Sequence, residues 1–216
     1  MSAVGARRRA TWTAPPLWGA PRDWVGESTL VICGGESVRA QREQIRAFKG
    51  RVIAVKHGVL LRPDADVLFF AGERAEEIAP PCLAAFRGTD IVVRGKGHPV
   101  FPDHAKRIWR TTVHVGLSDD PFMVSGYDAG TSAINLATLR GSKLVVVVGY
   151  DMTGGRWFNG EIPHYLPQPP ERDFQIHMSC LPAIAEDAKR KGIRIVNCSP
   201  TSRVDCFERE PLEAFL

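Results

Sequence analysis

The sequence lacks the cysteine and histidine spacings that hold metals or build a disulfide scaffold. Its five cysteines are odd in number and scattered, with no CxxC pair: Cys33, Cys82, Cys180, Cys198 and Cys206. None stands at metal-ligand spacing from a histidine, so neither a zinc-binding nor a disulfide-rich class is indicated. The pattern indicates the reduced thiols of a cytoplasmic protein, several of them in the core.

Long apolar runs are also missing. No segment approaches the roughly 20 apolar residues that a membrane helix needs, so no membrane span is expected. A basic cluster occupies residues 7–9, but no apolar block follows it, and a secretory signal is therefore not expected. The chain contains no internal repeat and no low-complexity tract.

Two common nucleotide-binding motifs are absent. The turn at residues 34–37 reads GGES, which fits neither the GxGxxG of dinucleotide folds nor the GxxxxGK[ST] of a P-loop. Neither an NAD-dependent enzyme nor a P-loop NTPase is therefore indicated. Taken alone, this turn is equally explained as a tight connection between a strand and a helix.

The bulk composition describes an ordinary globular chain. At 216 residues, with 44% hydrophobic and 24% charged residues, it is long enough for one domain with a substantial core. The net charge of +4 is mild. Such a charge suits anionic ligands, nucleotides or nucleic acid, without requiring any of them.

The segment at residues 143–152, KLVVVVGYDM, is the strongest structural signal. An uninterrupted apolar run is typical of a strand buried on both faces, as in a parallel sheet covered by helices. It ends at Asp151. Ligands of open parallel sheets bind beyond the carboxyl ends of the strands, so a functional carboxylate is expected there.

Strands and helices alternate through most of the chain. Strands are predicted at residues 28–33, 51–56, 66–70, 90–94, 109–114, 143–149 and 193–197, and helices at 38–48, 74–86, 133–139 and 173–191. The second helix is expected to break at Pro80 and Pro81. This rhythm predicts an α/β fold: a single doubly wound Rossmann-like domain with a mostly parallel sheet and helices on both faces.

The predicted domain spans residues 28–207, between an N-terminal arm (1–27) and a C-terminal tail (208–216). The arm carries an arginine triplet (residues 7–9), three prolines and three tryptophans. A basic arm with tryptophans could contact nucleic acid through phosphates and base stacking. The preferred interpretation is an arm that wraps over its own domain or over a partner subunit, which leaves a homo-oligomer open.

Polar and glycine residues follow most of the predicted strands, and parallel strands bring such positions to one edge of the sheet. The candidate nucleotide-binding residues are Gly34, Gly35, Glu36, Ser37, Lys56, His57, Gly72, Asp128, Gly130, Thr131, Ser132, Tyr150, Ser199, Thr201 and Ser202. The segments 34–37 and 128–132 also open helices, whose unpaired N–H groups suit a phosphate. Taken singly, each of these residues is equally explained by packing, capping or solvation.

Six short motifs, in order, resemble one superfamily. They are CGGES (33–37), AVKH (54–57), PDADVLFF (63–70), DAGTSAINLA (128–137), VGYDM (148–152) and NCSPTS (197–202). One branch is related to archaeal 6-hydroxymethyl-dihydropterin diphosphokinase and has many phage members. The other contains small bacterial sialyltransferases that use a CMP-sugar donor. The resemblance covers about residues 28–207.

The resemblance implies that the nucleotide lies across residues 34–37, 56–57 and 128–132. Three residues depart from the family pattern. Glu36 replaces a proline, Lys56 stands where asparagine is common, and Ala129 replaces a serine. An acid beside a diphosphate needs a compensating cation, whereas a lysine suits a phosphate directly.

The resemblance also implies a histidine general base. In the sialyltransferase branch a histidine before the penultimate helix takes the proton of the acceptor hydroxyl, and His177 stands near that position. His164, in the loop after Asp151, is the competing candidate. A histidine that titrates near neutral pH suits this task. Asp151 is expected to organise the site.

Three functions follow as hypotheses. The first is a cytoplasmic glycosyltransferase that uses a nucleotide-sugar donor and a glycan or modified nucleic acid as acceptor. A loop arginine (Arg156 or Arg172) would neutralise the donor phosphate, and residues 153–172 would close over the site as a lid that excludes water. The second is an ATP-dependent diphosphokinase with Mg²⁺ on Asp151 and Glu36 or Glu73, although no motif indicates the metal. The third is a nucleotide-binding protein of the same fold without catalysis.

Overall fold

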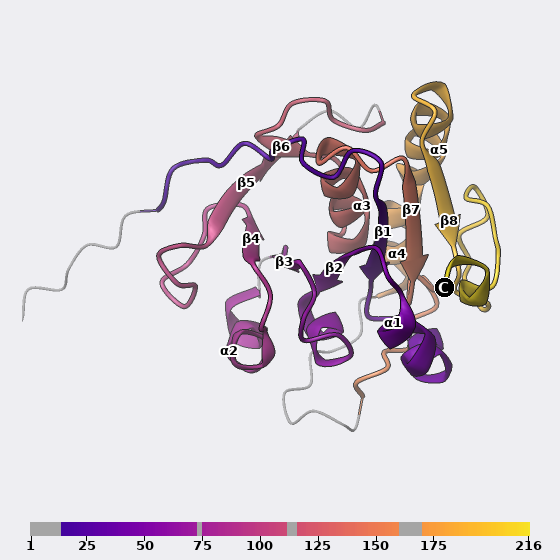
Figure 1. Ribbon diagram of the computed structural model, residues 1–216, viewed down its shortest axis with the longest axis horizontal. Helices are drawn as coiled ribbons and strands as arrows, with labels where there is room; N and C mark the ends of the chain where they lie inside the picture. Colours follow the sequence, from indigo (N-terminus) through magenta and orange to yellow (C-terminus); the bar gives the residue numbers. More distant parts are fainter. Residues whose placement is uncertain (1–13, 73–74, 112–115, 160–169) are drawn as a thin grey trace, which may run out of the picture.

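The fold is built on one sheet of eight parallel strands, in the order β6-β5-β4-β3-β2-β1-β7-β8 (Figure 1). This computed structural model describes residues 14–72, 75–111, 116–159 and 170–216. The strands are β1 (Ser28–Ile32), β2 (Arg51–Val55), β3 (Val67–Phe70), β4 (Asp90–Arg94), β5 (Lys106–Arg110), β6 (Met123–Val124), β7 (Leu144–Val148) and β8 (Arg194–Asn197). The predicted α/β Rossmann-like fold is confirmed.

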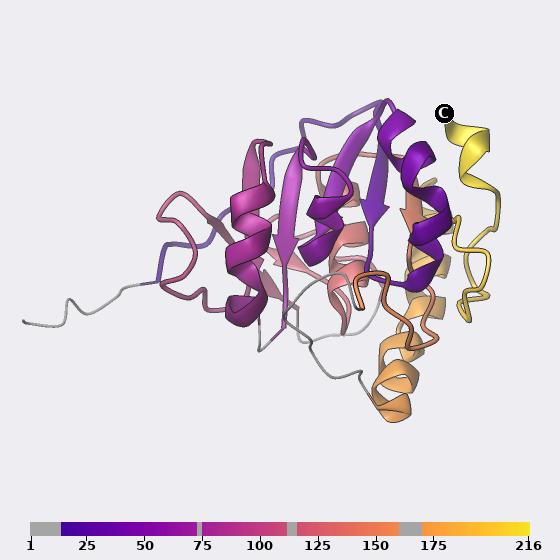
Figure 2. The same cartoon turned by 90° about the horizontal axis from the view of Figure 1, so that it is seen from below.

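Helices cover both faces of the sheet (Figure 2). They are the 3₁₀ helices η1 (Glu36–Gln41), η2 (Lys56–Leu60) and η3 (Leu212–Phe215), and the α-helices α1 (Arg42–Ala47), α2 (Ala75–Ala85), α3 (Ala129–Leu139), α4 (Glu171–Ser179) and α5 (Leu181–Arg190). The core between the sheet and α3 and α5 contains Val145 and Val147, whereas Val146 and Val148 face the core beneath α1 and α2. All four valines are fully buried, which explains the unbroken apolar run.

The strand order places a topological switch point beside β1. The chain runs outward from β1 through β2 to β6 on one side, and then returns to place β7 and β8 on the other. In open parallel sheets the loops after the two strands at the switch point separate and leave a crevice. The loops after β1 and β7 therefore define where a ligand would bind.

The helix α2 differs from the prediction. It continues through Pro80 and Pro81, which were expected to break it. The two prolines lie in its second turn, exposed or half-buried, while Ile78, Ala79 and Cys82 are fully buried against the sheet. Burial of this apolar face offsets the backbone hydrogen bonds that the prolines cannot donate.

Other element boundaries also shift. The predicted helix 38–48 is η1 followed by the short α1, and the predicted helix 173–191 is divided at Cys180 into α4 and α5. α3 begins four residues earlier than predicted, because Asp128 caps it. The strand predicted at 109–114 is β5, which starts at Lys106, and residues 112–115 lie outside the described part. Helix starts depend on capping contacts that apolar periodicity does not report.

Residues 14–27 of the predicted arm pack along the domain. Trp24 is buried, and its backbone N–H donates to the carbonyl of Arg140 (2.7 Å). The Arg140 guanidinium lies 4.0 Å from the Trp24 ring centre and bridges Asp23 and the buried Asp90. The described part of the arm therefore wraps over its own domain, as the preferred interpretation expected. Residues 1–13, which include the arginine triplet, lie outside the described residues.

Replacing Asp23 with asparagine is expected to lower the free energy of unfolding by about 1 kcal/mol, because the bidentate pair with Arg140 is lost. Urea denaturation at pH 7 measures the change. The matched control is Asp64→Asn, since Asp64 forms an exposed ion pair with Arg62 (2.9 Å) and should lose less than half as much. Equal losses in the two variants would contradict the anchoring role.

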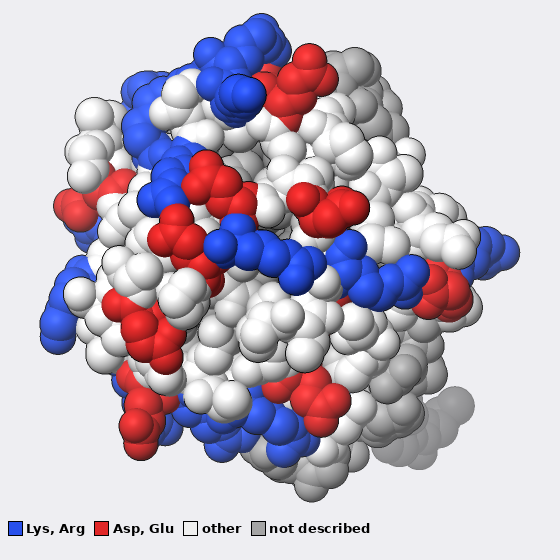
Figure 3. Space-filling model, turned by 90° about the vertical axis from the view of Figure 1, so that its right-hand side faces the viewer, with Lys and Arg blue, Asp and Glu red and all other residues white. Residues whose placement is uncertain are grey.

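The C-terminal tail also joins the fold. The N–H of Asn197 in β8 donates to the carbonyl of Glu208 (2.8 Å), and Leu212 is fully buried in the core beneath α1. On the face shown in Figure 3, basic and acidic side chains are interspersed. Arg194 pairs with Glu208 and Glu210 in this way. All five cysteines are free, and no described helix is long and apolar enough to cross a bilayer.

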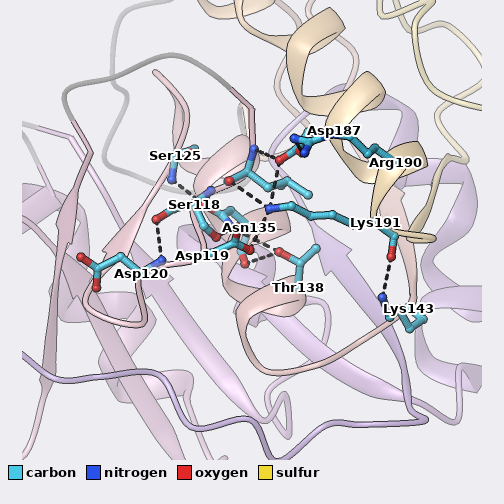
Figure 4. A network of polar contacts seen from close by, with 11 residues as sticks. Ser118, Asp119, Asp120, Ser125, Asn135, Thr138, Lys143, Asp187, Arg190 and Lys191 are labelled. Carbon is cyan, nitrogen blue, oxygen red and sulfur yellow. Dashed lines mark hydrogen bonds and ion pairs between the residues drawn. The ribbon is translucent and has the colours of Figure 1, made fainter.

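A polar network fixes the segment before β6 against α3 and α5 (Figure 4). The amide oxygen of buried Asn135 accepts from the N–H groups of Ser118 (3.0 Å) and Ser125 (2.7 Å). Buried Asp187 accepts from the N–H of Leu117 (2.9 Å) and pairs with Lys191 (3.1 Å). The network holds α3, and with it the loop that precedes its first turn, in a fixed position.

Candidate functional site

A cavity of about 210 Å³ opens at the carboxyl ends of β1, β2 and β7, at the switch point. Nine of the candidate residues line it: Gly34, Gly35, Lys56, His57, Asp128, Gly130, Tyr150, Asp151 and His177. They come from five separate segments of the chain. The tertiary structure therefore brings half of the eighteen predicted site residues into one cavity.

Asp151 braces the glycine turn after β1. Its carboxylate accepts from the Ser37 N–H (2.9 Å) and the Ser37 hydroxyl (2.5 Å). The Asp151 side chain is almost fully buried, and a β-carbon on Gly35 would lie 2.5 Å from its Cγ. Only glycine therefore allows this turn to approach the carboxylate. Asp151 holds the floor of the cavity in shape.

Asp128 performs the equivalent task at α3. Its carboxylate accepts from the Thr131 N–H (3.0 Å), the Thr131 hydroxyl (2.5 Å) and the Tyr150 hydroxyl (3.0 Å). Tyr150 is buried, and its ring lies so close to Gly130 that a β-carbon there would stand 2.6 Å away. This cluster ties the start of α3 to the end of β7.

These contacts correct one expectation about phosphate binding. The N–H groups that open the two helices were predicted to be unpaired and available to a phosphate. In the structure, Ser37 N–H donates to Asp151 and Thr131 N–H donates to Asp128. Each helix start already has a carboxylate partner, and a phosphate there would meet like charge. An anionic ligand in this cavity would therefore be bound by the cations rather than by these two helix starts.

Lys56 is the most unusual cation of the cavity. It follows β2 in the left-handed region (φ 52°), which non-glycine residues rarely adopt. Burial, and then the charges of Arg94 and Arg156, lower the pKa of Lys56 from 10.5 to about 8. Its ammonium makes no hydrogen bond or ion pair with any residue that the structure describes. The Asp128 carboxylate opposes this shift but does not cancel it. A strained backbone and a desolvated charge are features of ligand sites.

The segment after Asp151 forms a wall of the cavity. Arg156 pairs with Gly35 in an antiparallel bridge, and the Trp157 N–H donates to the carbonyl of Gly34 (3.2 Å). The Phe158 ring lies 4.3 Å from the ring of buried His57. Of the two candidate loop arginines, Arg156 lines the cavity; the other, Arg172, is exposed and pairs with Asp173. Residues 160–169 of the predicted lid lie outside the described part.

His177 is the candidate base that lines the cavity. It lies on α4, half-buried, one helical turn after Phe174, which also lines the cavity. His164, the competing candidate, lies outside the described residues. Of the described histidines in the cavity, His57 lies under Phe158, whereas His177 has the more exposed ring.

Several candidate residues lie elsewhere. Ser199 and Ser202 are buried behind β7, where Ser199 accepts from the Tyr150 N–H (2.8 Å) and Ser202 donates to the Tyr150 carbonyl (2.7 Å). Thr201 is exposed. Glu36 lies 3.9 Å from Arg39 and does not itself line the cavity. Its carboxylate lies against Gly155 in the cavity wall, where a β-carbon would stand 2.6 Å from the Glu36 Oε2.

The remaining candidates support the cavity or adjoin it. Ser132 is fully buried, and its hydroxyl donates to the carbonyl of Ser125 (2.9 Å). Gly72 lies beside Lys56, in the wall of a neighbouring cavity. Side-chain direction at a strand end depends on the local turn, so the sequence could place these residues at the rim without saying which way they point.

One cation was missed by the sequence analysis. Arg94, the last residue of β4, donates to the carbonyls of Gly126 (3.1 Å) and Asp128 (3.1 Å) and to the hydroxyl of Ser132 (2.5 Å). Burial lowers the pKa of Arg94 to about 10. It clamps the loop that carries Asp128. The signal was present, since the strand at 90–94 ends on the same rim, but its end was not included among the candidates.

The three acids predicted as magnesium ligands do not meet in the described residues. The Asp151 carboxylate accepts from Ser37, Glu36 lies 3.9 Å from Arg39, and Glu73 lies outside the described residues. Among the residues that the structure describes, no three His, Cys, Asp or Glu side chains converge as metal ligands. We therefore derive no metal-dependent step.

Comparison with known proteins gives one match, at the level of structure. No protein-family model matches the sequence, and no curated protein matches it. The fold is similar to that of a MAf glycosyltransferase from Magnetospirillum magneticum AMB-1 (TM-score 0.60, 13% identity, 94% of this chain covered). The chain spans 36% of that protein's length. At this identity the likeness shows a shared fold.

Proposed function

We propose that this protein is a glycosyltransferase that moves a sugar from a nucleotide-activated donor to an acceptor hydroxyl. The observation that carries the proposal is the switch-point cavity, which contains both an ammonium without a described ion pair, Lys56, and a half-buried imidazole, His177. A cation for the donor phosphate and a base for the acceptor are the two groups that this reaction needs. The fold shared with a glycosyltransferase agrees with this assignment.

The donor would bind with its phosphate at Lys56 and Arg156. These two cations lie in a partly enclosed cavity, where electrostatic interactions are stronger than in water. Phe158 and Phe174 supply apolar surface for a nucleobase or sugar ring. Asp151 and Asp128 shape the cavity through the glycine turn and the start of α3, and neither needs to touch the reacting atoms.

The reaction then divides between two side chains. The His177 imidazole accepts the proton of the acceptor hydroxyl as its oxygen attacks the anomeric carbon of the donor sugar. The bond between that carbon and the donor phosphate oxygen breaks, and the electron pair leaves with the nucleotide. Lys56 stabilises the negative charge that develops on the leaving oxygen. The resemblance of the sequence to small sialyltransferases implies a histidine base near this position, with His164 as the competing candidate.

The rival functions are less well supported. Among the described residues no three His, Cys, Asp or Glu side chains converge, so no described feature favours a magnesium-dependent diphosphokinase. The non-catalytic binding protein rests on the three departures at Glu36, Lys56 and Ala129. The half-buried His177 in the cavity favours a catalytic protein over it.

A ligand screen tests the proposal. Thermal unfolding is measured with CMP-, UDP-, GDP- and TDP-sugars, with the free nucleotides and with ATP, each with and without Mg²⁺. A donor at about 100 times its dissociation constant adds about 2.7 kcal/mol of stability, or roughly 5–10 °C for a chain of this size. We expect one nucleotide-sugar class to stabilise the protein without Mg²⁺. Stabilisation by ATP alone, and only with Mg²⁺, would overturn the proposal in favour of the diphosphokinase.

A further inference from the structure

A second cavity lies beside the first, at the carboxyl ends of β4 and β5. Its volume is about 640 Å³, and its lining includes Arg94, Lys96, Phe101, Trp109 and Arg110. Lys96 and Arg110 do not line the first cavity. None of the functional roles described above uses either of these two side chains.

The charged side chains that the structure describes around this second cavity are all positive. Its described lining contains three cations, Arg94, Lys96 and Arg110, and no aspartate or glutamate. Lys96 and Arg110 are exposed, and their side chains form no ion pair or hydrogen bond with residues that the structure describes. The charge of Arg110 acts on Arg94 and lowers its pKa further. Like charges gathered around a concave surface attract an anion, which relieves their repulsion.

The walls of the two cavities touch, although no residue lines both. Lys56 lines the first cavity, and a β-carbon on Gly72, in the wall of the second, would lie 3.6 Å from its Nζ. Arg94 lines the second and donates to the carbonyl of Asp128 (3.1 Å), which lines the first. A molecule held in the second cavity would therefore reach the ligand of the first across Lys56 and Arg94.

We propose that the second cavity is the acceptor subsite, and that the acceptor is a small molecule carrying an anionic group, a phosphate or a carboxylate. This inference rests on the proposed glycosyltransferase function. Lys96 and Arg110 would bind the anionic group, and Phe101 and Trp109 would pack against the body of the acceptor. The acceptor hydroxyl would then face the donor sugar where the walls of the two cavities touch, at Lys56 and Arg94.

Isothermal titration of the full chain with inorganic phosphate, glucose 6-phosphate and glucuronate tests the subsite. The test variant is Lys96→Gln/Arg110→Gln. The matched control is Arg46→Gln/Lys189→Gln, which removes the same charge from exposed positions outside both cavities. We expect at least tenfold weaker binding of the preferred anion in the test variant and less than a twofold change in the control. If glucose 6-phosphate binds more tightly than glucuronate, the acceptor carries a phosphate. If glucuronate binds more tightly, the acceptor carries a carboxylate.

Two results would overturn the proposal: unchanged binding in the test variant, or equal weakening in both variants, which would mean a diffuse charge effect. Circular dichroism and thermal unfolding check that both variants fold, as expected for exposed positions. Tenfold tighter binding of a duplex DNA than of any small anion, lost in the test variant, would also overturn it, in favour of a nucleic-acid acceptor.

The same variants separate this inference from the proposed function. Stabilisation by the nucleotide sugar is expected to be unchanged in Lys96→Gln/Arg110→Gln, because neither residue lines the donor cavity. If no nucleotide sugar stabilises the natural protein while anion binding still depends on Lys96 and Arg110, the glycosyltransferase assignment fails and only the anion site stands. If the donor binds and the anion does not, the acceptor inference alone fails.

Discussion

Replacing His177 with alanine is expected to lower the turnover of sugar transfer by about 100- to 10,000-fold, the range typical for loss of a general base. The donor should still bind, because Lys56 and the glycine turn remain in place. The measurement is nucleotide release in the presence of acceptor, together with the thermal shift caused by the donor. A fall in turnover with an unchanged shift would place His177 in the chemical step.

The control for this variant is His104→Ala, which removes an exposed histidine that does not line the cavity. It should keep full turnover. His164→Ala is measured in parallel. If His177→Ala keeps full turnover while His164→Ala loses it, the base is His164; if both keep it, the histidine mechanism is wrong.

Replacing Lys56 with asparagine is expected to weaken the binding of the nucleotide by about 10- to 100-fold, the effect of losing one charge-assisted hydrogen bond to a phosphate. The same change should make the free protein more stable, by about 1–2 kcal/mol at pH 7. Two causes add: the desolvated ammonium is removed, and asparagine tolerates the left-handed backbone (φ 52°) better than lysine. A substitution that weakens nucleotide binding while it stabilises the free protein identifies Lys56 as a ligand-binding residue. Replacement of a structural residue would instead destabilise the free protein.

The pH dependence follows from the lowered pKa of Lys56. Its pKa in the folded protein, about 8, is below the ordinary 10.5. The charged form therefore destabilises the fold fully below pH 8, and this cost is relieved as pH rises from 8 towards 10.5. The stability gained by Lys56→Asn should shrink over the same interval. Nucleotide affinity of the natural protein should fall above about pH 8, and that of the variant should not.

Calorimetric titration and urea denaturation between pH 6.5 and 10 measure both effects. The matched control is Lys49→Asn, a substitution of an exposed lysine that lines neither cavity. It should change nucleotide affinity by less than twofold at every pH. Equal weakening by Lys49→Asn, or a loss of stability in Lys56→Asn, would contradict the role assigned to Lys56.

The backbone at Lys56 lies in the left-handed region (φ 52°), which glycine and asparagine adopt more easily than lysine. In this chain lysine occupies the position despite the backbone strain. The strained conformation places a cation in the lining of the cavity.

The sequence alone determined the sheet and the rim where ligands bind. An apolar run such as Val145–Val148, with neighbouring valines in two different cores, has no stable place except between two layers of helices. Parallel strands then direct all their carboxyl ends to one edge, so the glycine turn, Lys56 and Asp151 could be assigned to the same rim from the order of elements. These conclusions depend on local patterns a few residues long.

Only the tertiary structure decided which rim residues face a ligand. Asp151 was expected to organise the site, and the partner of its carboxylate is Ser37, 114 residues earlier in the chain. Asp128 is likewise held by Tyr150, and Ser199 turns back to the Tyr150 backbone. Contacts between strand ends depend on the strand order across the sheet, which leaves no periodicity in the sequence. The cations Lys56 and Arg110 could therefore be recognised as lacking an ion pair with a described residue only once the described carboxylates had been placed.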